Sequence, residues 1–136
     1  ERRLLLSGGA DRALAGVRPV LSLDELRQAQ VAVEAVTVAD KLLDYVMALV
    51  QRTRSTRDLV LGVSPRGAQG FFRAVQAHAL VAGRPFATPD DVKKVAPAVL
   101  AHRILASATG RYEGTGAGRR EREALQKILD EVAVPL

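Results

Sequence analysis

Apolar residues recur at helical spacing along most of the chain. In residues 38–54, one face of the expected helix carries Val38, Leu42, Tyr45, Val46, Leu49 and Val50. The same pattern predicts helices over about 23–35, 65–82 and 119–132, and another that starts after Thr88. Between them, Asp58–Gly62 reads as a loop or a very short strand. We therefore expect an all-α fold, a bundle of about five helices with at most a very short strand pair.

Capping patterns mark where two of these helices begin. Ser22 with Glu25 three residues later is a capping box, and Thr88-Pro89-Asp90-Asp91 combines a cap, a proline and two first-turn acids. The helix after Ser22 lacks a wide apolar stripe, so we expect it to lie near the surface. Pro97 has no amide hydrogen and its ring clashes with the carbonyl of Lys93, which predicts a break or kink there.

The two ends of the chain differ from this helical body. Residues 1–21 read as an irregular connector, 22–109 as the helical domain, and 110–136 as a glycine-rich loop with a terminal helix packed on that domain. Because the chain begins with Glu1 and not with methionine, we expect it to be a piece of a longer protein.

Composition narrows the chemistry. The 136 residues include no cysteine, which excludes disulfides, thiol catalysis and cysteine-ligated zinc and fits a reducing compartment such as the cytoplasm. His78 and His102 stand too far apart for a metal pair on one helix, so we predict no metal site. No apolar run reaches the roughly 18 residues of a membrane helix. The net charge of +5 favours an anionic partner, whereas only 4% aromatic residues argue against binding of single-stranded nucleic acid.

The common catalytic motifs are missing. The chain has no Gly-x-x-x-x-Gly-Lys-[Ser/Thr] phosphate loop, no Gly-x-Ser-x-Gly and no His-Glu-x-x-His, so we predict no catalytic residue within it. Asp90 and Asp91 fit first-turn helix acids better than an acid/base pair, and His78 fits a structural histidine. Asp130-Glu131 follows an apolar run as magnesium-binding acids do, but its helical context favours a solvated helix end.

One predicted helix start lacks the first-turn acids that follow Ser22 and Thr88. Ser64 is a natural N-cap and Pro65 a natural first residue, but Arg66 then places a cation where the helix dipole disfavours it by roughly 0.3–1 kcal/mol. No acid accompanies it, because Gly67 and Ala68 follow. Backbone amides at a helix start and a guanidinium both favour phosphate, so this departure indicates an anion site. The alternative is a surface arginine without a partner.

Small residues form a stripe along the same helix, bordering the line from Arg66 to Arg73. The stripe consists of Gly67, Gly70, Ala74, Ala77 and Val81. It would let a flat ligand or another backbone come close. Tight packing between helices is the alternative explanation.

Residues Gly62-Val63-Ser64-Pro65-Arg66 resemble the second-sensor motif of AAA+ ATPases, in the form found in the MoxR family. The stretch from Gly83-Arg84-Pro85-Phe86 to Thr88-Pro89-Asp90-Asp91-Val92 is also similar to that family, and so is Val99-Leu100-Ala101-His102-Arg103-Ile104. Residues 17–22, Tyr45 and Thr53-Arg54 fit as well. The similarity covers roughly residues 17–105, and the glycine-rich stretch 114–118 departs from the family pattern.

The resemblance implies a helical lid that packs beside a nucleotide-binding core. In such a lid Arg66 is the sensor that reaches the γ-phosphate of ATP, with Ser64 and Pro65 beside it and Gly67, Gly70 and Arg73 in secondary positions. It further implies that the whole protein hydrolyses ATP with magnesium as a ring oligomer. Its partners would be its own core, neighbouring subunits and a client protein, for which a von Willebrand factor A-type domain is one candidate.

Two other functions stay open at this point. A helical DNA-binding module would use the helix over 65–82, where Arg66, Gln69, Arg73 and Gln76 form a line that can read bases. Against it, glycine and alanine flank that line and no dense cluster of basic residues surrounds it. The other alternative is a plain helical scaffold.

Overall fold

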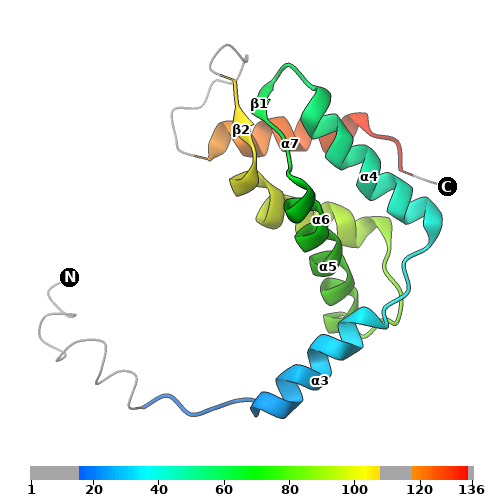
Figure 1. Ribbon diagram of the computed structural model, residues 1–136, viewed down its shortest axis with the longest axis vertical. Coiled ribbons are helices and arrows are strands. Elements are labelled where there is room, and N and C mark those ends of the chain that lie inside the picture. The colour runs from blue at the N-terminus through cyan, green and yellow to red at the C-terminus, as the bar shows by residue number, and fades with distance from the viewer. Residues whose placement is uncertain (1–15, 108–117, 135–136) are drawn as a thin grey trace, which may run out of the picture. The chain divides into compact units, whose positions relative to one another are not determined.

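The computed structural model describes residues 16–107 and 118–134. Within them lie five α-helices, shown in Figure 1: α3 (Leu23–Glu34), α4 (Asp40–Ser55), α5 (Pro65–Val81), α6 (Pro89–Leu100) and α7 (Arg119–Glu131). The strands β1 (Leu59–Leu61) and β2 (Leu105–Ala106) pair antiparallel, and the short 3-10 helix η1 (Ala101–Arg103) joins α6 to β2. The predicted all-α bundle with a very short strand pair is confirmed.

The chain divides into two compact units, residues 1–30 and residues 31–136. In the described part of the first unit, the predicted capping box forms at the start of α3. The backbone amide of Ser22 donates to Glu25 Oε2 at 2.7 Å, and the amide of Glu25 donates to Ser22 Oγ at 3.2 Å. No residue of α3 is buried, which confirms the surface position that its narrow apolar pattern predicted.

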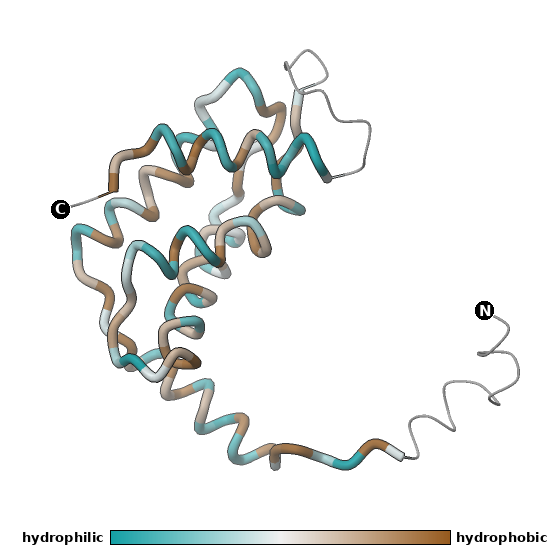
Figure 2. Tube along the Cα trace, turned by 180° about the vertical axis from the view of Figure 1, so that it is seen from behind, coloured by the Kyte–Doolittle hydropathy of each residue, from teal (hydrophilic) through white to brown (hydrophobic). Residues whose placement is uncertain are grey.

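The core of the second unit is built by α4, α5, α6 and α7. Apolar and polar residues alternate along these helices, as Figure 2 shows, and the apolar faces meet inside. Each helix contributes one of the largest fully buried side chains: Leu49, Phe71, Leu100 and Leu125. Burying a side chain of this size stabilises the fold by roughly 1.5–3 kcal/mol. The predicted apolar face of α4 is confirmed, since all of its members except the partly buried Val38 are in the core.

Contacts between the elements define how this unit is assembled. α5 packs against α6 and α4, and α7 packs against α4 and α6. The strand pair links α4 to α7, because β1 contacts α4 and β2 contacts α7. The loop before α5 lies against the end of α4 at Gly62, and Arg103 of η1 lies near Gly67 in the first turn of α5.

Of the two outcomes predicted at Pro97, the break does not occur, and the kink stays a prediction. α6 runs without interruption from Pro89 to Leu100, and η1 follows directly. An internal proline costs a helix about 3 kcal/mol. Here Ala96 and Leu100, on either side of the proline, are both fully buried, so core packing holds the helix through it.

Parts of the predicted ends fall outside the described residues. The glycine-rich loop lies almost wholly within residues 108–117, and most of the predicted connector lies within 1–15. Gly118, at the end of that loop, is the N-cap of α7 with a left-handed φ of 76°. Among the described residues, no helix is long and apolar enough to cross a membrane.

Candidate functional site

The start of α5 has the geometry that the sequence predicted. Ser64 is the N-cap, its Oγ accepts from the backbone amide of Gly67 at 3.1 Å, and Pro65 is the first helical residue. The first turn contains no acid. Arg66 in this turn is exposed and makes no hydrogen bond or ion pair to any described residue. The cation therefore remains available for an external anion.

Arg66 lies in a groove that is lined by residues of α4, α5 and η1 and by Glu34, the last residue of α3. The apolar part of the lining includes Leu43, Val46, Met47 and Phe72. The charged part consists of Arg54, Arg66, Arg73, Arg103 and Glu34. Four guanidinium groups thus share the groove with one carboxylate, and this excess of positive charge favours an anionic ligand.

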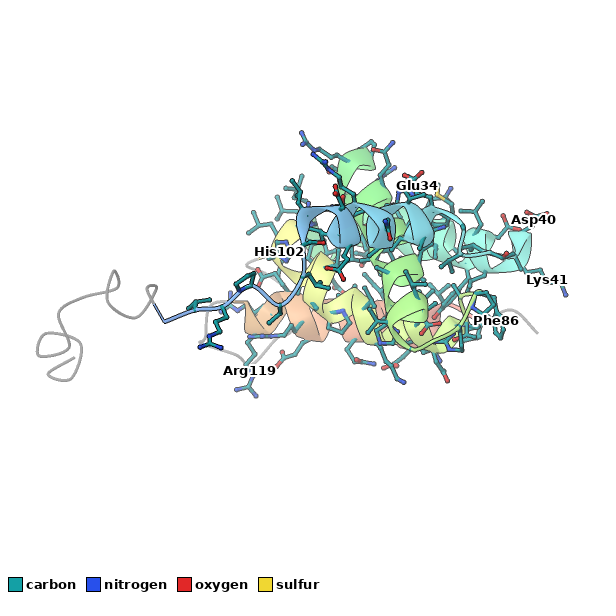
Figure 3. All side chains as sticks on the ribbon, turned by 90° about the horizontal axis from the view of Figure 1, so that it is seen from below. Glu34, Asp40, Lys41, Phe86, His102 and Arg119 are labelled. Atoms are coloured by element: carbon teal, nitrogen blue, oxygen red, sulfur yellow. The ribbon has the colours of Figure 1, made fainter. Side chains whose placement is uncertain are left out.

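The arginines of the groove differ in how they are engaged. Arg73 Nη2 forms an ion pair with Glu34 Oε1 at 2.7 Å, and Figure 3 labels Glu34 on its helix. Arg54 donates through Nε to the carbonyl of Val63 at 2.7 Å. Arg103 donates through Nε to the carbonyl of Val99 at 3.0 Å. Arg73 therefore has a carboxylate partner, whereas Arg66 has none among the described residues.

The stripe of small residues on α5 is not a single packing face. Gly67 is buried in its own turn, where an added Cβ would lie 3.1 Å from Val63 Cγ1 and 3.3 Å from Ser64 Oγ. Gly70 lines the groove and has open space at its Cβ position. Val81, at the far end, is 88% exposed. The members of the stripe thus face different surroundings, and tight packing between helices stays an explanation for part of it, since α5 packs against α6.

The proposed DNA-reading line is interrupted. Arg66, Gln69, Arg73 and Gln76 all line the groove, but Arg73 is held by Glu34 and Gln76 is buried. Gln76 Nε2 donates to the carbonyl of Val36 at 3.0 Å. Of these four side chains, only Arg66 and Gln69 are exposed and make no such contact with another described residue. Two available side chains disfavour base reading by this helix.

The groove includes two arginines that reasoning from the residues alone did not select. Arg54 and Arg103 are named there only through the family resemblance. They lie far from Arg66 in sequence, and the assembly of α4, α5 and η1 brings them into one groove. The proline and serine before Arg66 gave a local signal, but no such signal exists for the other two.

A second charged cluster lies away from the groove, around Asp91. Its buried carboxylate accepts from Arg84 Nη2 at 2.6 Å and from the backbone amide of Thr88 at 2.8 Å, and contacts His78 Nδ1 at 2.7 Å. The Arg84 guanidinium is the main reason why the pKa of Asp91 lies far below its ordinary value. The cluster ties α5 to the start of α6, so the structural interpretation of His78 and of the first-turn acid is confirmed.

Within the described ranges, no group of three or more histidine, cysteine, aspartate or glutamate residues is arranged to hold a metal ion. The groove with its arginines is therefore the candidate site that the described residues support best.

The family model of the AAA lid domain matches residues 51–128 of this chain. The uncharacterized protein YeaC of Bacillus subtilis is 34% identical over 120 residues, which are 88% of this chain and 36% of YeaC. Chaperone MoxR1 of Mycobacterium tuberculosis is 30% identical over 127 residues, which are 87% of this chain and 33% of that protein. Protein MoxR of Paracoccus denitrificans is 50% identical over 72 residues, covering 53% of this chain and 19% of that protein.

A crystal structure of a candidate ATPase from Cytophaga hutchinsonii has the same fold. It superposes with a TM-score of 0.75 at 24% identity, over 99% of this chain and 41% of that one.

The chain spans about a third of the length of YeaC and MoxR1. The segment that the family model matches contains all of α5, including its start at the groove, together with the strand pair and most of α7. The chain belongs to the AAA lid domain family, and it is a lid domain of the MoxR type.

Proposed function

We propose that this lid supplies Arg66 to the ATP site of a MoxR-type AAA+ ATPase, where the guanidinium contacts the γ-phosphate. The rest of the protein would provide the phosphate loop and the magnesium ligands. Ser64 and Pro65 start the helix that presents Arg66. ATP hydrolysis is thus a property of the whole protein, to which this domain contributes a sensor of the terminal phosphate.

The exposed, unpaired state of Arg66 is the observation that carries this proposal. The side chain lies in the first turn of a capped helix, where backbone amides add partial positive charge. Arg54 and Arg103 line the same groove and add two more positive charges. A cation placed there lowers the stability of the isolated helix, and a phosphate would reverse that effect.

At the level of the whole protein, we propose a ring of ATPase subunits in which the lid contacts its own core and a neighbouring subunit. One relative is named as a chaperone, which supports a role in remodelling a client protein. A client with a von Willebrand factor A-type domain is the candidate that the resemblance to the MoxR family suggests.

Steady-state ATP turnover by the full-length protein tests the sensor role. Arg66→Ala should lower turnover roughly tenfold to a hundredfold, since a hydrogen bond to a charged group contributes about 1.5–3 kcal/mol. Arg66→Lys should recover only part, because lysine keeps the charge and loses the planar fork. Arg73→Ala is the matched control in the same groove, and it should have a smaller effect because Glu34 already pairs with Arg73.

Thermal melts of the same variants separate function from folding. Arg66 is exposed and bonded to no described residue, so Arg66→Ala should leave the melting temperature nearly unchanged. A variant that melts the domain, or one that hydrolyses ATP at the wild-type rate, would show that Arg66 is not the sensor. Salt-dependent binding of the chain to duplex DNA would instead support the DNA-binding alternative.

A further inference from the structure

Side chains at the end of α4 hold the residue just before the N-cap of α5. The backbone amide of Val63 donates to Thr53 Oγ1 at 3.0 Å, and the carbonyl of Val63 accepts from Arg54 Nε at 2.7 Å. Thr53 Oγ1 donates its own hydrogen to the carbonyl of Val50 at 2.6 Å. Two consecutive residues of α4 thus satisfy both backbone polar groups of Val63.

The bonds that the Thr53 hydroxyl makes are buried. Thr53 and Val63 are each only 1% exposed. A buried amide without an acceptor is strongly unfavourable, so the position of Val63 depends on the Thr53 hydroxyl. Since that hydroxyl is fixed by its own bond to Val50, it has one orientation, and Val63 is held in one place.

Gly62 allows the loop to come this close. A Cβ at Gly62 would lie 2.6 Å from the carbonyl oxygen of Thr53 and 2.8 Å from the backbone nitrogen of Arg54. Both neighbours are backbone atoms of α4, which cannot rotate away. The glycine therefore belongs to the same arrangement as the Thr53-Arg54 pair, although seven residues lie between Arg54 and Gly62 in the order of the chain.

The constraint on Val63 continues directly into the first turn of α5. Val63 Cγ1 lies against Gly67, where an added Cβ would lie 3.1 Å from it, closer than ordinary van der Waals contact. Ser64, the next residue, caps the same Gly67 amide. Arg66 stands between these fixed points, so the end of α4 sets where its backbone lies.

We propose that Thr53 and Arg54 are positioning residues for Arg66, and that Gly62 is the residue that lets them act. They anchor the loop before α5 and so hold the guanidinium of Arg66 in one position relative to its ligand. The inference rests on the proposed function of Arg66 as the contact to the γ-phosphate. A misplacement of about 1 Å at a catalytic contact can lower a rate by up to about a hundredfold, so such anchoring has a measurable effect.

The test is a double-mutant cycle in the full-length protein. Thr53→Val should lower ATP turnover about tenfold when Arg66 is present, and should cause no further loss in the Arg66→Ala background. Thr53→Ser keeps the hydroxyl and should retain most of the wild-type rate. Thr56→Val is the matched control, because the Thr56 hydroxyl binds only the amide of Asp58 in the described part of the chain, and it should leave turnover unchanged.

Arg54→Lys is a second test of the positioning role. Its side chain is exposed, so the change removes the Nε bond to Val63 without emptying a buried site. All assays are run below the melting temperatures of the variants, which are measured in parallel. Arg54→Lys should show the same dependence on Arg66 as Thr53→Val.

The outcomes separate this inference from the proposed function. Equal losses from Thr53→Val with and without Arg66 would mean a purely structural role and would overturn the inference. An Arg66→Ala loss without any loss from Thr53→Val or Arg54→Lys would overturn it too, while leaving the sensor role intact. If Arg66→Ala itself has no effect, the proposed function fails and the inference fails with it.

Discussion

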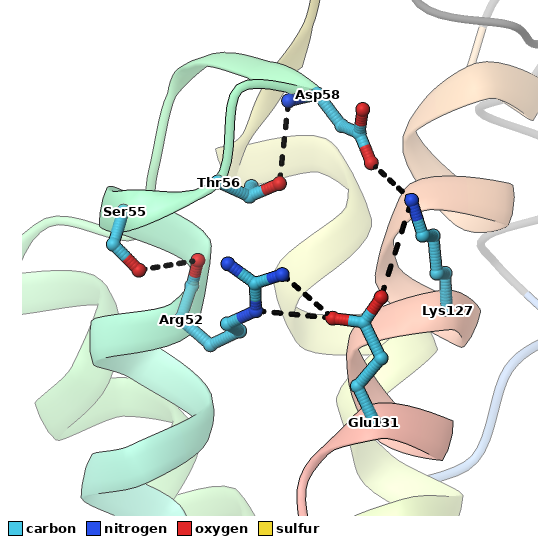
Figure 4. A network of polar contacts seen from close by, with 6 residues as sticks. All are labelled: Arg52, Ser55, Thr56, Asp58, Lys127 and Glu131. Atoms are coloured by element: carbon cyan, nitrogen blue, oxygen red, sulfur yellow. Dashed lines mark hydrogen bonds and ion pairs between the residues drawn. The ribbon is translucent and has the colours of Figure 1, made fainter.

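Arg52 on α4 and Glu131 on α7 are joined by two hydrogen bonds, at 3.0 and 2.8 Å, although 79 residues separate them in the chain (Figure 4). Lys127, one turn before Glu131, forms an ion pair with Asp58 at 2.8 Å in the turn that leads into β1. The terminal helix is therefore linked at its surface both to α4 and to the segment before β1.

The surface charges on α7 should stabilise it less than its apolar face does. Both members of the Arg52–Glu131 pair are more than a third exposed, and such pairs contribute about 0.2–1 kcal/mol. Arg52→Met should lower the free energy of unfolding by no more than about 1 kcal/mol. Leu125→Ala, in the core, should lower it by roughly 2–5 kcal/mol. Urea unfolding of the two variants checks this order, and a larger cost for Arg52→Met would show that charges hold the helix.

Substitution by alanine at two glycines should change the stability of the domain in opposite directions. Gly62→Ala pushes a methyl group against the backbone of α4, so it should destabilise the domain by roughly 1–3 kcal/mol. Gly70→Ala adds a methyl group to a helix interior with open space around it, and should stabilise by about 0.5–1 kcal/mol. Thermal unfolding of both variants is the measurement. Equal shifts in one direction would contradict the close contact between the loop and α4.

Asp91 should make the domain sensitive to acid. Because Arg84 and Thr88 hold the pKa of the Asp91 carboxyl below its ordinary value of about 3.9, the folded state keeps this charge longer than the unfolded state. The resulting stability is fully present above about pH 4 and is lost as the pH falls toward the folded-state pKa, by up to about 1.4 kcal/mol per pH unit.

Asp91→Asn isolates this contribution from the other carboxylates. At pH 6 the substitution should lower the free energy of unfolding by about 3 kcal/mol, as removal of one partner of a buried ion pair does. The difference from the wild type should shrink at pH 3. Urea titrations at the two pH values provide the comparison, and a difference that grows on acidification would contradict the assigned direction of the pKa shift.

The chain by itself should fold and yet not hydrolyse ATP. Its four packed helices supply a core of their own, so circular dichroism should show a mainly helical protein. Its sequence contains no phosphate loop, so turnover with ATP and magnesium should equal the background rate. Hydrolysis by this chain alone, abolished by removal of magnesium, would contradict its assignment as a lid.

Local patterns were sufficient to predict the helices. Apolar spacing and capping residues placed α5 and α7 within a residue or so of their observed ends, because these signals act within a few turns. α4 begins at Asp40, two residues later than its apolar pattern suggested, with Ala39 as the N-cap. The predicted break at Pro97 does not occur, because the buried neighbours Ala96 and Leu100 hold the helix through the proline.

Contacts between distant segments were beyond the reach of such patterns. The partner of β1 is only two residues long, and nothing in the sequence around Leu105 signals a strand. The same holds for Arg54 and Arg103, which approach Arg66 only because three elements pack together. Arg66 could be selected because its departure from the capping rule is local, whereas the groove around it is a product of the fold.

The ratio of ATP affinity to ADP affinity tests the contact between Arg66 and the γ-phosphate most directly. Both nucleotides share every group except that phosphate, so the full-length protein and its Arg66→Ala variant can be compared by calorimetry under the same conditions. The account predicts that the variant loses about tenfold in affinity for ATP and keeps its affinity for ADP. An unchanged ratio, with both affinities equal to the wild type or both lowered alike, would contradict it.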